Sequence, residues 1–537
     1  MSDKTEAKAH KRSWPIFRVL FSRLTLFIVF LLIQIAILWF SFNFLNEKLS
    51  YGFFIALSAL EIIIILNQEG SSLFKIAWIV PIMLAPVFGG LLYVFIRIQT
   101  TVKKMRHRLD QEVIASRNEM LESREVSRAI KEEGSPELSS LADYLYGFCG
   151  FPAYKDTEVR FFKLGEDFFP VFCEELKKAE HFIFLEYFIV SKGEIWDKVL
   201  SIPTKKAKEG VEIRFMYDGT NAIKNLPFRY DEYLKSLGID AKIFSPMIPA
   251  LASYQNNRDH RKICVIDGVV AFTGGLNLAD EYANINSPYG VWKDTAAMFK
   301  GSAANSFSML FLQMWNSAHG RRGTEENGDI KKLPYRKYGY DVSRSYDRRD
   351  KGTEAPGFVI PYGDSPLDNE NIGLSVYTSI INEARDYVHI MTPYLILDDS
   401  TMSALCYAAK RGVDVKILFP HIPDKPYAFW LGHTYYKELI QNGVRIFEYL
   451  PGFVHAKEFI SDGRKAVIGS INLDFRSLYL HFENAVYMYG VPAIDDMEKD
   501  FNECLKDCVE IDMQVYEELP KLKLLLGGAL KVFAPLF

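Results

Sequence analysis

Paired cysteine motifs are missing from this chain of 537 residues, which contains six cysteines in all. None of the six belongs to a CxxC pair. Cys504 and Cys508 lie four residues apart on a predicted helix, but no histidine is near them, which disfavours a zinc site. The scattered pattern is typical of reduced thiols in a protein whose folded region faces the cytosol.

An excess of positive charge is missing as well, because the formal net charge is −4. Proteins that hold nucleic acid through a global positive field have the opposite balance, so the composition argues against a nucleic-acid partner. Hydrophobic residues make up 49% of the chain, which is enough to form buried cores. At roughly 100 to 200 residues per domain, the length predicts about three units.

Long apolar runs are concentrated in residues 1–100, which we predict to be an N-terminal membrane region with transmembrane helices. The candidate segments are 24–45, 51–66 and 76–96. A spanning helix needs about 20 mainly apolar residues, and the first and third segments meet that length. The second segment is shorter and contains Glu61. The first run is too long for a cleaved signal peptide, and no small-residue cleavage site follows it.

Basic residues crowd both flanks of the membrane region, before Leu24 and from Arg97 to Arg108. The positive-inside rule places both flanks in the cytosol, which requires an even number of crossings. Three candidate segments give an odd number. Either one segment is re-entrant or interfacial, or one flank breaks the rule. We therefore predict a multi-pass protein of the cell membrane with a cytosolic folded region, without fixing the number of crossings.

From about Val159 onward, the chain has the alternation of strand-like and helix-like segments that is typical of an α/β protein. Short apolar runs such as residues 181–188 predict buried strands, and residues 168–179 and 195–209 predict helices between them. The predicted organisation is a charged linker helix with a lead-in (101–158), a first half (159–320), a polar linker (321–356) and a second half (357–537). Within the lead-in, residues 101–134 predict one solvated helix.

The two halves repeat each other. Residues 206–214 resemble residues 408–416, and each segment predicts a helix end, a glycine turn and a strand. The strongest match is a motif in which His, Lys, Asp and Asn recur with identical spacing. In the first half it is His260, Lys262, Asp267 and Asn277, and in the second half it is His455, Lys457, Asp462 and Asn472. Two copies in one register, each after a matching unit, are not an accident of composition.

The spacing of the motif favours phosphoryl chemistry. On a strand, His260 and Lys262 project from the same face, as do His455 and Lys457. If the halves pack about a pseudo-twofold axis, both sets converge. Lysines and asparagine amides can hold phosphate oxygens, while one imidazole attacks phosphorus and the other protonates the leaving alcohol. This chemistry needs no metal and no other cofactor.

Each histidine also needs an acceptor that orients its second ring nitrogen. Asp294 follows His260 in the first half, and Glu483 follows His455 in the second half. We assign the orienting role to these carboxylates by half; the alternative is that both are ordinary surface carboxylates. The lone histidines His319, His389, His421 and His433 are predicted to be structural. Tyr187 and Tyr394 precede predicted site loops and either line the pocket or belong to the core.

These residues resemble the paired HKD motifs of the phospholipase D superfamily, and several phrases are similar to bacterial cardiolipin synthases in particular. The phrases are Leu185-Glu-Tyr187, Asn257-Arg-Asp-His-Arg-Lys262, Phe272-Thr-Gly-Gly275, Asp280-Glu-Tyr282, residues 449–457 and residues 469–477. The segment 75–93 resembles one helix of that family's N-terminal membrane hairpin. Two features depart from the family: the extra apolar segment 24–45, and His481 where members often have Asn.

The resemblance implies two pseudosymmetric α/β halves with mixed sheets flanked by helices, sharing one site. It also implies a phosphatidyltransferase that acts on phosphatidylglycerol in a membrane and releases cardiolipin and glycerol. His260 is our expected nucleophile and His455 the expected general acid and then base, with Asp267 and Asp462 in structural roles. A phospholipase D that uses water, a transferase that uses another alcohol, a nuclease and a non-enzymatic scaffold are the alternatives. The sequence contains no information on oligomeric state.

Overall fold

The computed structural model describes residues 23–44, 46–68, 72–97, 100–246, 256–318, 332–339 and 355–534. The chain divides into two compact units. One comprises residues 1–102 with 247–255, and the other comprises residues 103–246 and 256–537. His319 and most of the predicted linker 321–356 lie outside the described residues.

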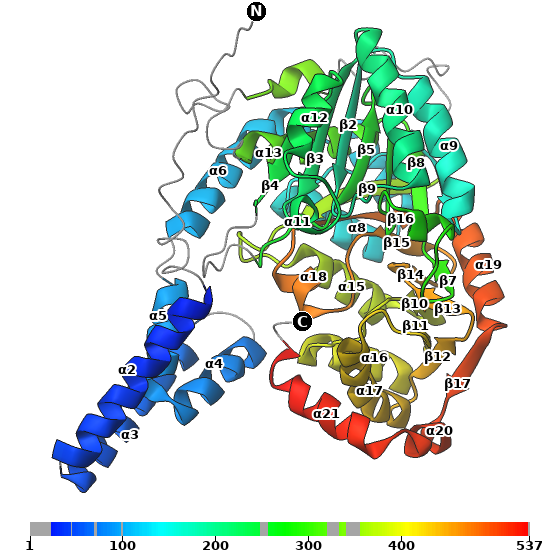
Figure 1. Ribbon diagram of the computed structural model, residues 1–537. Helices are drawn as coiled ribbons and strands as arrows, with labels where there is room; N and C mark the ends of the chain where they lie inside the picture. Colours follow the sequence, from blue (N-terminus) through cyan, green and yellow to red (C-terminus); the bar gives the residue numbers. More distant parts are fainter. Residues whose placement is uncertain are drawn as a thin grey trace, which may run out of the picture. The chain divides into compact units, whose positions relative to one another are not determined.

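The described residues of the first unit form four apolar helices, drawn in blue in Figure 1: α2 (Arg23–Phe44), α3 (Glu47–Leu66), α4 (Ser72–Leu84) and α5 (Pro86–Arg97). Within α2 and α3, residues 27–44 and 48–66 are long and apolar enough to cross a membrane. Asn46 caps α3 by accepting a hydrogen bond from the Lys48 amide. The second predicted segment is therefore longer than expected, because the helix begins before Tyr51.

The third predicted segment is not one spanning helix. It divides into α4 and α5 at Ala85, just before Pro86. Trp78 and Tyr93 have ring centroids 5.3 Å apart. In a straight helix, residues so far apart in sequence would be separated by about 22 Å along the axis. The two helices therefore fold back on each other as a hairpin, and the prolines and glycines of the segment permit that bend.

The lead-in to the second unit also differs from the prediction of one solvated helix. The structure has α6 (Thr100–Ser116), the 3-10 turn η1 (Arg117–Glu119) and α7 (Arg124–Glu133), which begins at the N-cap Ser123. Further on come α8 (Pro136–Asp143) and the π-helical turn η2 (Tyr144–Phe148). Glu112 is buried and accepts a 2.8 Å hydrogen bond from the Tyr335 hydroxyl of η6 (Tyr335–Tyr338). Helix α6 is thus packed against other parts of the second unit, a contact that its charged composition did not predict.

Two mixed sheets form the second unit and confirm the predicted pair of α/β halves. The first has the order β1-β8-β6-β5-β2-β3-β4, and the second has the order β17-β12-β11-β10-β14-β15-β16-β9. Read from opposite ends, the two orders match strand for strand, and β17 is an addition to the second sheet. The first-sheet strands are β1 (Glu158–Phe162), β2 (Phe182–Tyr187), β3 (Glu212–Asp218), β4 (Asp240–Phe244), β5 (Lys262–Ile266), β6 (Val270–Gly274) and β8 (Ala296–Lys300). The second-sheet strands are β9 (Phe358–Asp364), β10 (Tyr387–Met391), β11 (Asp414–Pro420), β12 (Arg445–Tyr449), β14 (Glu458–Ser461), β15 (Lys465–Gly469), β16 (Glu483–Tyr489) and β17 (Cys508–Ile511).

Helices flank both sheets. In the first half they are α9 (Gly165–Lys177), α10 (Glu194–Lys208), α11 (Asn221–Lys224), α12 (Tyr230–Ser236), η4 (Asp280–Ala283) and α13 (Ala304–Ser317). In the second half they are α15 (Ile372–Glu383), α16 (Asp399–Lys410), α17 (Pro426–Gln441), α18 (Phe475–Tyr479), α19 (Ala493–Leu505), α20 (Met513–Glu518) and α21 (Lys521–Lys531). The predicted helices near 168–179 and 195–209 correspond to α9 and α10.

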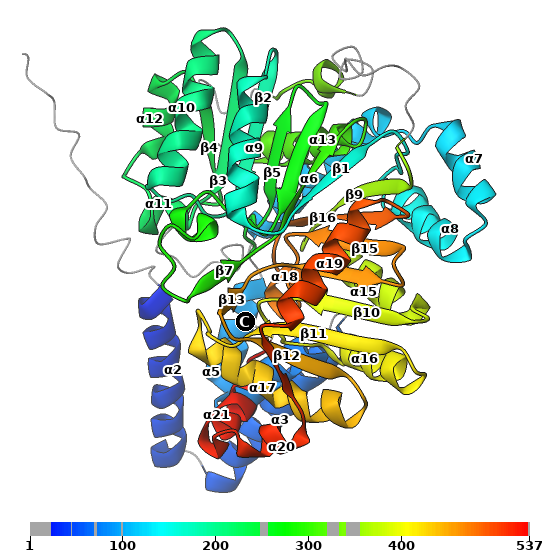
Figure 2. The ribbon, with the colours of Figure 1, turned by 90° about the vertical axis from the view of Figure 1, so that its right-hand side faces the viewer.

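The last long helix of the first half and its counterpart in the second half join the two halves. Every residue of α13 is buried, because the helix packs on β2 and β5 of its own sheet and also on β9. Its counterpart α19 packs on β12 and β14 and also on β1. A short parallel pair, β7 (Val291–Lys293) with β13 (Gly452–Val454), crosses the junction, as Figure 2 shows. The two halves are therefore one folded body.

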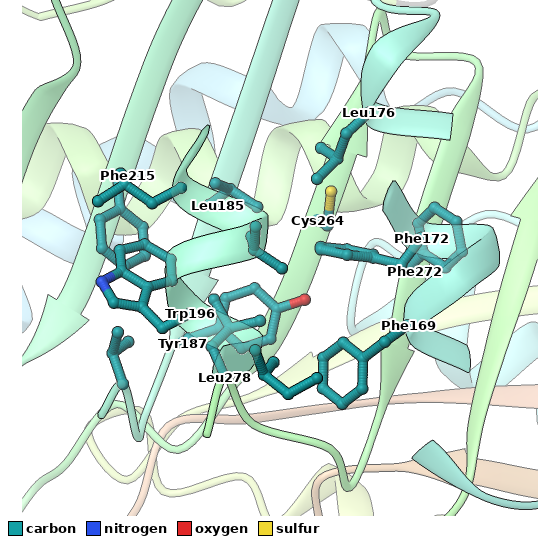
Figure 3. Packing of buried hydrophobic residues seen from close by; sticks show 14 of the residues in the cluster. Phe169, Phe172, Leu176, Leu185, Tyr187, Trp196, Phe215, Cys264, Phe272 and Leu278 are labelled. Carbon is teal, nitrogen blue, oxygen red and sulfur yellow. The ribbon is translucent and has the colours of Figure 1, made fainter. Parts of the chain in front are cut away.

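Aromatic side chains dominate the core of the first half. Phe272 of β6 packs edge-on against Phe168 and Phe172 of α9, with ring centroids 5.6 and 5.2 Å apart. Figure 3 shows Phe172 and Phe272 of this layer together with Cys264 and Leu185 of the same cluster. All six residues of β2 are buried, which explains the continuous apolar run of this central strand. The core fixes β5, whose first residue is Lys262.

Candidate active site

Each histidine of the paired motifs hydrogen-bonds a carboxylate of the opposite half. His260 Nδ1 lies 2.8 Å from Glu483 Oε1, and His455 Nδ1 lies 2.6 Å from Asp294 Oδ2. The orienting role was expected for both carboxylates, but the expected pairing within each half is wrong, because the structure exchanges the partners. In both rings the hydrogen bond at Nδ1 leaves Nε2 for a ligand.

Backbone pairing across the junction explains the exchange. The Phe482 amide donates to the Arg258 carbonyl at 2.8 Å, and the His260 amide donates to the Phe482 carbonyl at 2.9 Å. The pseudosymmetric contact is the β7–β13 pair, in which the His455 amide donates to the Lys293 carbonyl at 2.6 Å. The residue after each paired segment is the carboxylate, so each half delivers it directly to the other half's histidine.

Burial sets the protonation of the imidazoles. His260 and His455 are each 7% exposed. Burial lowers the pKa of His260 to about 3, although Glu483 acts in the opposite direction. Burial, with the charges of Lys457, Lys262 and Lys425, holds the pKa of His455 well below its ordinary value. Both rings are therefore neutral near pH 7 in the unliganded protein, as a nucleophilic imidazole requires.

The two carboxylates differ in their surroundings. Burial raises the pKa of Glu483, but its contact with His260, with His481 and Lys262 nearby, outweighs burial, and the pKa of Glu483 is lowered overall. Glu483 also accepts a hydrogen bond from the Ser470 hydroxyl. Burial raises the pKa of Asp294 to about 6, against the charge of Lys457. Glu483 is thus the more firmly ionised of the two carboxylates.

The two motif lysines lie within electrostatic range of both halves. Burial lowers the pKa of Lys262 to about 7 and the pKa of Lys457 to about 8, and each lysine feels both Glu483 and Asp294. The ammonium of each lysine donates to the carbonyl of its motif histidine. Two cations that are so poorly hydrated favour an anionic ligand such as a phosphodiester.

The motif aspartates hold turns rather than a ligand. Asp267 accepts hydrogen bonds from the amides of Glu180, His181 and Phe182 at 2.7 to 2.8 Å. Asp462 makes the equivalent bonds to the amides of Arg385, Asp386 and Tyr387. Both aspartates have positive φ, of 52° and 54°, in the tight turn that follows the motif strand. These contacts agree with the structural role expected of them.

The motif asparagines are engaged within the protein. Asn277 accepts from the Ile189 amide at 2.9 Å and donates to the Tyr282 hydroxyl at 2.8 Å. Asn472 donates to Asp474 at 3.0 Å. Each amide group keeps one N–H for a ligand, so phosphate binding by these residues stays a prediction.

Two aromatic side chains beside the motif histidines, Phe188 and Trp292, were not among the site residues predicted from the sequence. Phe188 lies 4.8 Å from His260 between ring centroids, and Trp292 lies 5.2 Å from His455. His481 occupies the place beside His260 that Trp292 occupies beside His455, because each is two residues before the exchanged carboxylate. Neither ring nitrogen of His481 has a hydrogen-bond partner among the described residues. The departure at position 481 was visible in the sequence, but its place beside His260 depends on the packing of the halves.

His260, His481 and Glu483 also bring one donor atom each within 4.8 Å of one another, a spacing at which a metal ion could be held. That the reaction needs no metal therefore stays a prediction.

The lone histidines bond to carboxylates away from the paired motifs. His389 lies 3.0 Å from Glu498, and His421 and His433 both contact Glu448. These contacts agree with structural roles. Tyr187 lies in the hydrophobic core of the first half.

Comparison with known proteins places the chain in a family. It matches the family described as "Cardiolipin synthase, PLD-like domain" over residues 172–315 and 377–505, and the "Phospholipase_D-nuclease N-terminal" family over residues 54–97. A Geobacillus cardiolipin synthase is 35% identical over 72% of this chain and 73% of its own length. Cardiolipin synthase 1 of Bacillus anthracis is 30% identical over 88% and 91%. An uncharacterized protein of Streptococcus mutans is 42% identical over 89% and 99%.

A solved structure supports the fold. The phosphatidylserine synthase of Haemophilus influenzae superimposes with a TM-score of 0.54 at 16% identity, covering 73% of this chain and 98% of its own. The two halves with their paired motifs define a protein of the phospholipase D superfamily. Within it, the chain belongs to the cardiolipin synthase family.

The exchanged pairing predicts which residues are coupled in energy. Glu483→Leu and His260→Ala should destabilise the protein non-additively, with a coupling free energy of about 1–3 kcal/mol, because each removes the same buried hydrogen bond. The destabilising effects of Glu483→Leu and His455→Ala should be additive, because these two side chains do not share a hydrogen bond. Thermal unfolding of the two single and one double variants of each pair in detergent gives both couplings. Coupling of Glu483 to His455 in place of His260 would contradict the exchange.

Proposed function

We propose that this protein is a phosphatidyltransferase that makes cardiolipin from two molecules of phosphatidylglycerol. The observation that carries the proposal is the buried junction at which two neutral imidazoles, each oriented by the other half's carboxylate, meet two lysines. Membership of the cardiolipin synthase family supports the choice of donor and acceptor.

The first half-reaction forms one bond and breaks another at phosphorus. His260 Nε2 attacks the phosphorus of phosphatidylglycerol, the N–P bond forms, and the P–O bond to glycerol breaks. His455 gives its Nε2 proton to the departing glycerol oxygen. Lys262 and Lys457 stabilise the negative charge on the non-bridging oxygens. The anionic phosphate raises the pKa of His455 when it binds, because it offsets the lysine charges that lower that pKa in the unliganded protein.

The second half-reaction reverses these roles. His455, now neutral, accepts the proton of a hydroxyl group of the second phosphatidylglycerol. That oxygen attacks phosphorus, the new P–O bond forms and the N–P bond breaks, which regenerates His260. The product carries two phosphatidyl groups on one glycerol. Asp294 holds the His455 ring in one orientation through both steps and stabilises its charged form.

The architecture of the first unit supports a cytosolic location for the catalytic unit. Helices α2 and α3 each contain a stretch long and apolar enough to cross a membrane, whereas α4 and α5 form a hairpin. With a re-entrant hairpin the number of crossings is two, so both basic flanks lie on the same side. We propose a multi-pass protein of the cell membrane, with phospholipid substrates and no nucleic-acid partner. Tethering raises the effective concentration of lipids confined to the same bilayer.

Product analysis tests the proposed reaction. The purified protein is given phosphatidylglycerol as the sole phospholipid, and lipids and free glycerol are followed by mass spectrometry. We expect cardiolipin and glycerol in equal amounts and the loss of both in His260→Ala. Phosphatidic acid as the main product would mean that water is the acceptor. Absence of turnover by the folded protein would mean that the donor or the acceptor is a different lipid.

The lowered lysine pKa values predict the alkaline side of the pH profile. The unliganded site needs charged lysines to bind a phosphate anion, and the pKa values of Lys262 and Lys457 are about 7 and about 8. We therefore expect kcat/KM for phosphatidylglycerol to fall as the pH rises through this range. Lys262→Arg should shift the fall upward, because arginine stays charged. A profile that is flat up to pH values near the ordinary pKa of lysine would contradict this reading.

A further inference from the structure

A polar cluster lies at the carboxyl edge of the second sheet, outside the paired motifs. Tyr394 follows β10, and Asp424 and Lys425 follow the neighbouring parallel strand β11. Ligands of α/β sheets commonly bind at this edge, where the loops after parallel strands meet. We call Tyr394, Asp424 and Lys425 the headgroup cluster.

The headgroup cluster shares this edge with His455. Strand β14 runs antiparallel to β10 with Glu458 opposite Met391, so the residues that precede β14 lie beside those that follow β10. The Tyr394 ring lies 6.4 Å from the Phe453 ring, which lies 5.8 Å from the His455 ring. The cluster is thus on the His455 side of the site rather than the His260 side.

The cluster is internally bonded and still has capacity for a ligand. The Tyr394 hydroxyl donates to Asp424 Oδ2 at 2.7 Å, and Lys425 Nζ donates to the Tyr394 hydroxyl at 2.7 Å. Asp424 Oδ1 is buried and has no hydrogen-bond partner among the described residues. The Lys425 side chain is 47% exposed and lies over the Tyr394 ring. A buried acceptor without a donor costs about 1–3 kcal/mol, so a ligand hydroxyl at Oδ1 is favoured.

The reaction geometry indicates which molecule meets the cluster. In an in-line displacement the nucleophile and the leaving alcohol lie on opposite sides of phosphorus. With His260 as nucleophile, the space beside His455 holds the alcohol that leaves and the alcohol that enters. Glycerol, the leaving alcohol, has no phosphate. The entering phosphatidylglycerol presents a hydroxyl to His455 and carries a phosphate at the far end of the same glycerol.

We propose that the headgroup cluster binds the headgroup of the acceptor lipid. The Lys425 ammonium pairs with the acceptor's own phosphate, and Asp424 Oδ1 accepts a hydrogen bond from its glycerol hydroxyl. Tyr394 fixes both side chains in one arrangement. Such a site selects an alcohol that bears a phosphate over water and over free glycerol, and so favours synthesis over hydrolysis. The assignment rests on the proposed function, because it presupposes a phosphatidyl-enzyme that meets a second phosphatidylglycerol.

Two products of one incubation separate the acceptor from the donor. Phosphatidylglycerol is supplied in mixed micelles with isotopically labelled glycerol, and mass spectrometry follows cardiolipin, phosphatidic acid and labelled phosphatidylglycerol. Labelled phosphatidylglycerol arises when free glycerol attacks the phosphatidyl-enzyme, a step without an acceptor phosphate. Lys425→Met should lower cardiolipin formation about tenfold or more relative to glycerol exchange, because a charge-assisted hydrogen bond to phosphate is lost. The fall should lie mainly in KM for phosphatidylglycerol, with more phosphatidic acid.

Matched variants sharpen the test. Lys437→Met removes an exposed positive charge from helix α17, which begins right after Lys425, and should leave the ratio of cardiolipin to exchange unchanged. Lys425→Arg should restore most of the ratio, and Asp424→Asn and Tyr394→Phe should lower it. Equal loss of cardiolipin and exchange in Lys425→Met, or no loss of either, would overturn the proposal. If the unaltered protein forms neither product from phosphatidylglycerol, the proposed function itself falls.

Discussion

The hydrogen bond from each motif histidine to the opposite half's carboxylate is the interaction on which the site depends. It links His260 to Glu483 and His455 to Asp294, and both links rest on backbone pairing across the junction. Neither half contains both a motif histidine and the carboxylate that orients it. The active arrangement therefore exists only when the halves are docked, which the fully buried helix α13 and its counterpart α19 ensure by packing on both sheets.

Burial shifts the pKa values of the motif histidines and lysines and so sets their protonation states. Two lysines and two histidines share a junction from which water is largely excluded, and burial is the largest influence on the pKa of each. The lysines raise the affinity for a phosphate anion, and the anion in turn permits His455 to carry a proton. The pseudosymmetry is not complete: His481 faces His260 where Trp292 faces His455, and the headgroup cluster lies on the His455 side. Such differences allow two similar histidines to perform different steps.

The sequence predicted features that depend on local pattern. The repeat and the strand between the lysine and the aspartate of each motif follow from pattern and spacing. The structural roles of Asp267 and Asp462 were expected from the family resemblance. Features that depend on the docking of distant segments were not predicted. The exchange of Glu483 and Asp294 requires the relative orientation of the halves, and the burial of Glu112 requires its contact with Tyr335. The α4–α5 hairpin was hidden because its segment is as long as a spanning helix, and the Trp78–Tyr93 contact decides otherwise.

The most direct test of this account is to trap the phosphatidyl group on the enzyme. A phosphatidyl ester of p-nitrophenol serves as donor, because its leaving group departs without a proton from His455. With His455→Asn, the first step then proceeds while the second step lacks its base. Mass spectrometry of peptides kept at alkaline pH should find the phosphatidyl group on His260, and none in the variant that also carries His260→Asn. Release of nitrophenol without a lipid on His260, or a lipid retained when His260 is replaced, would contradict the account.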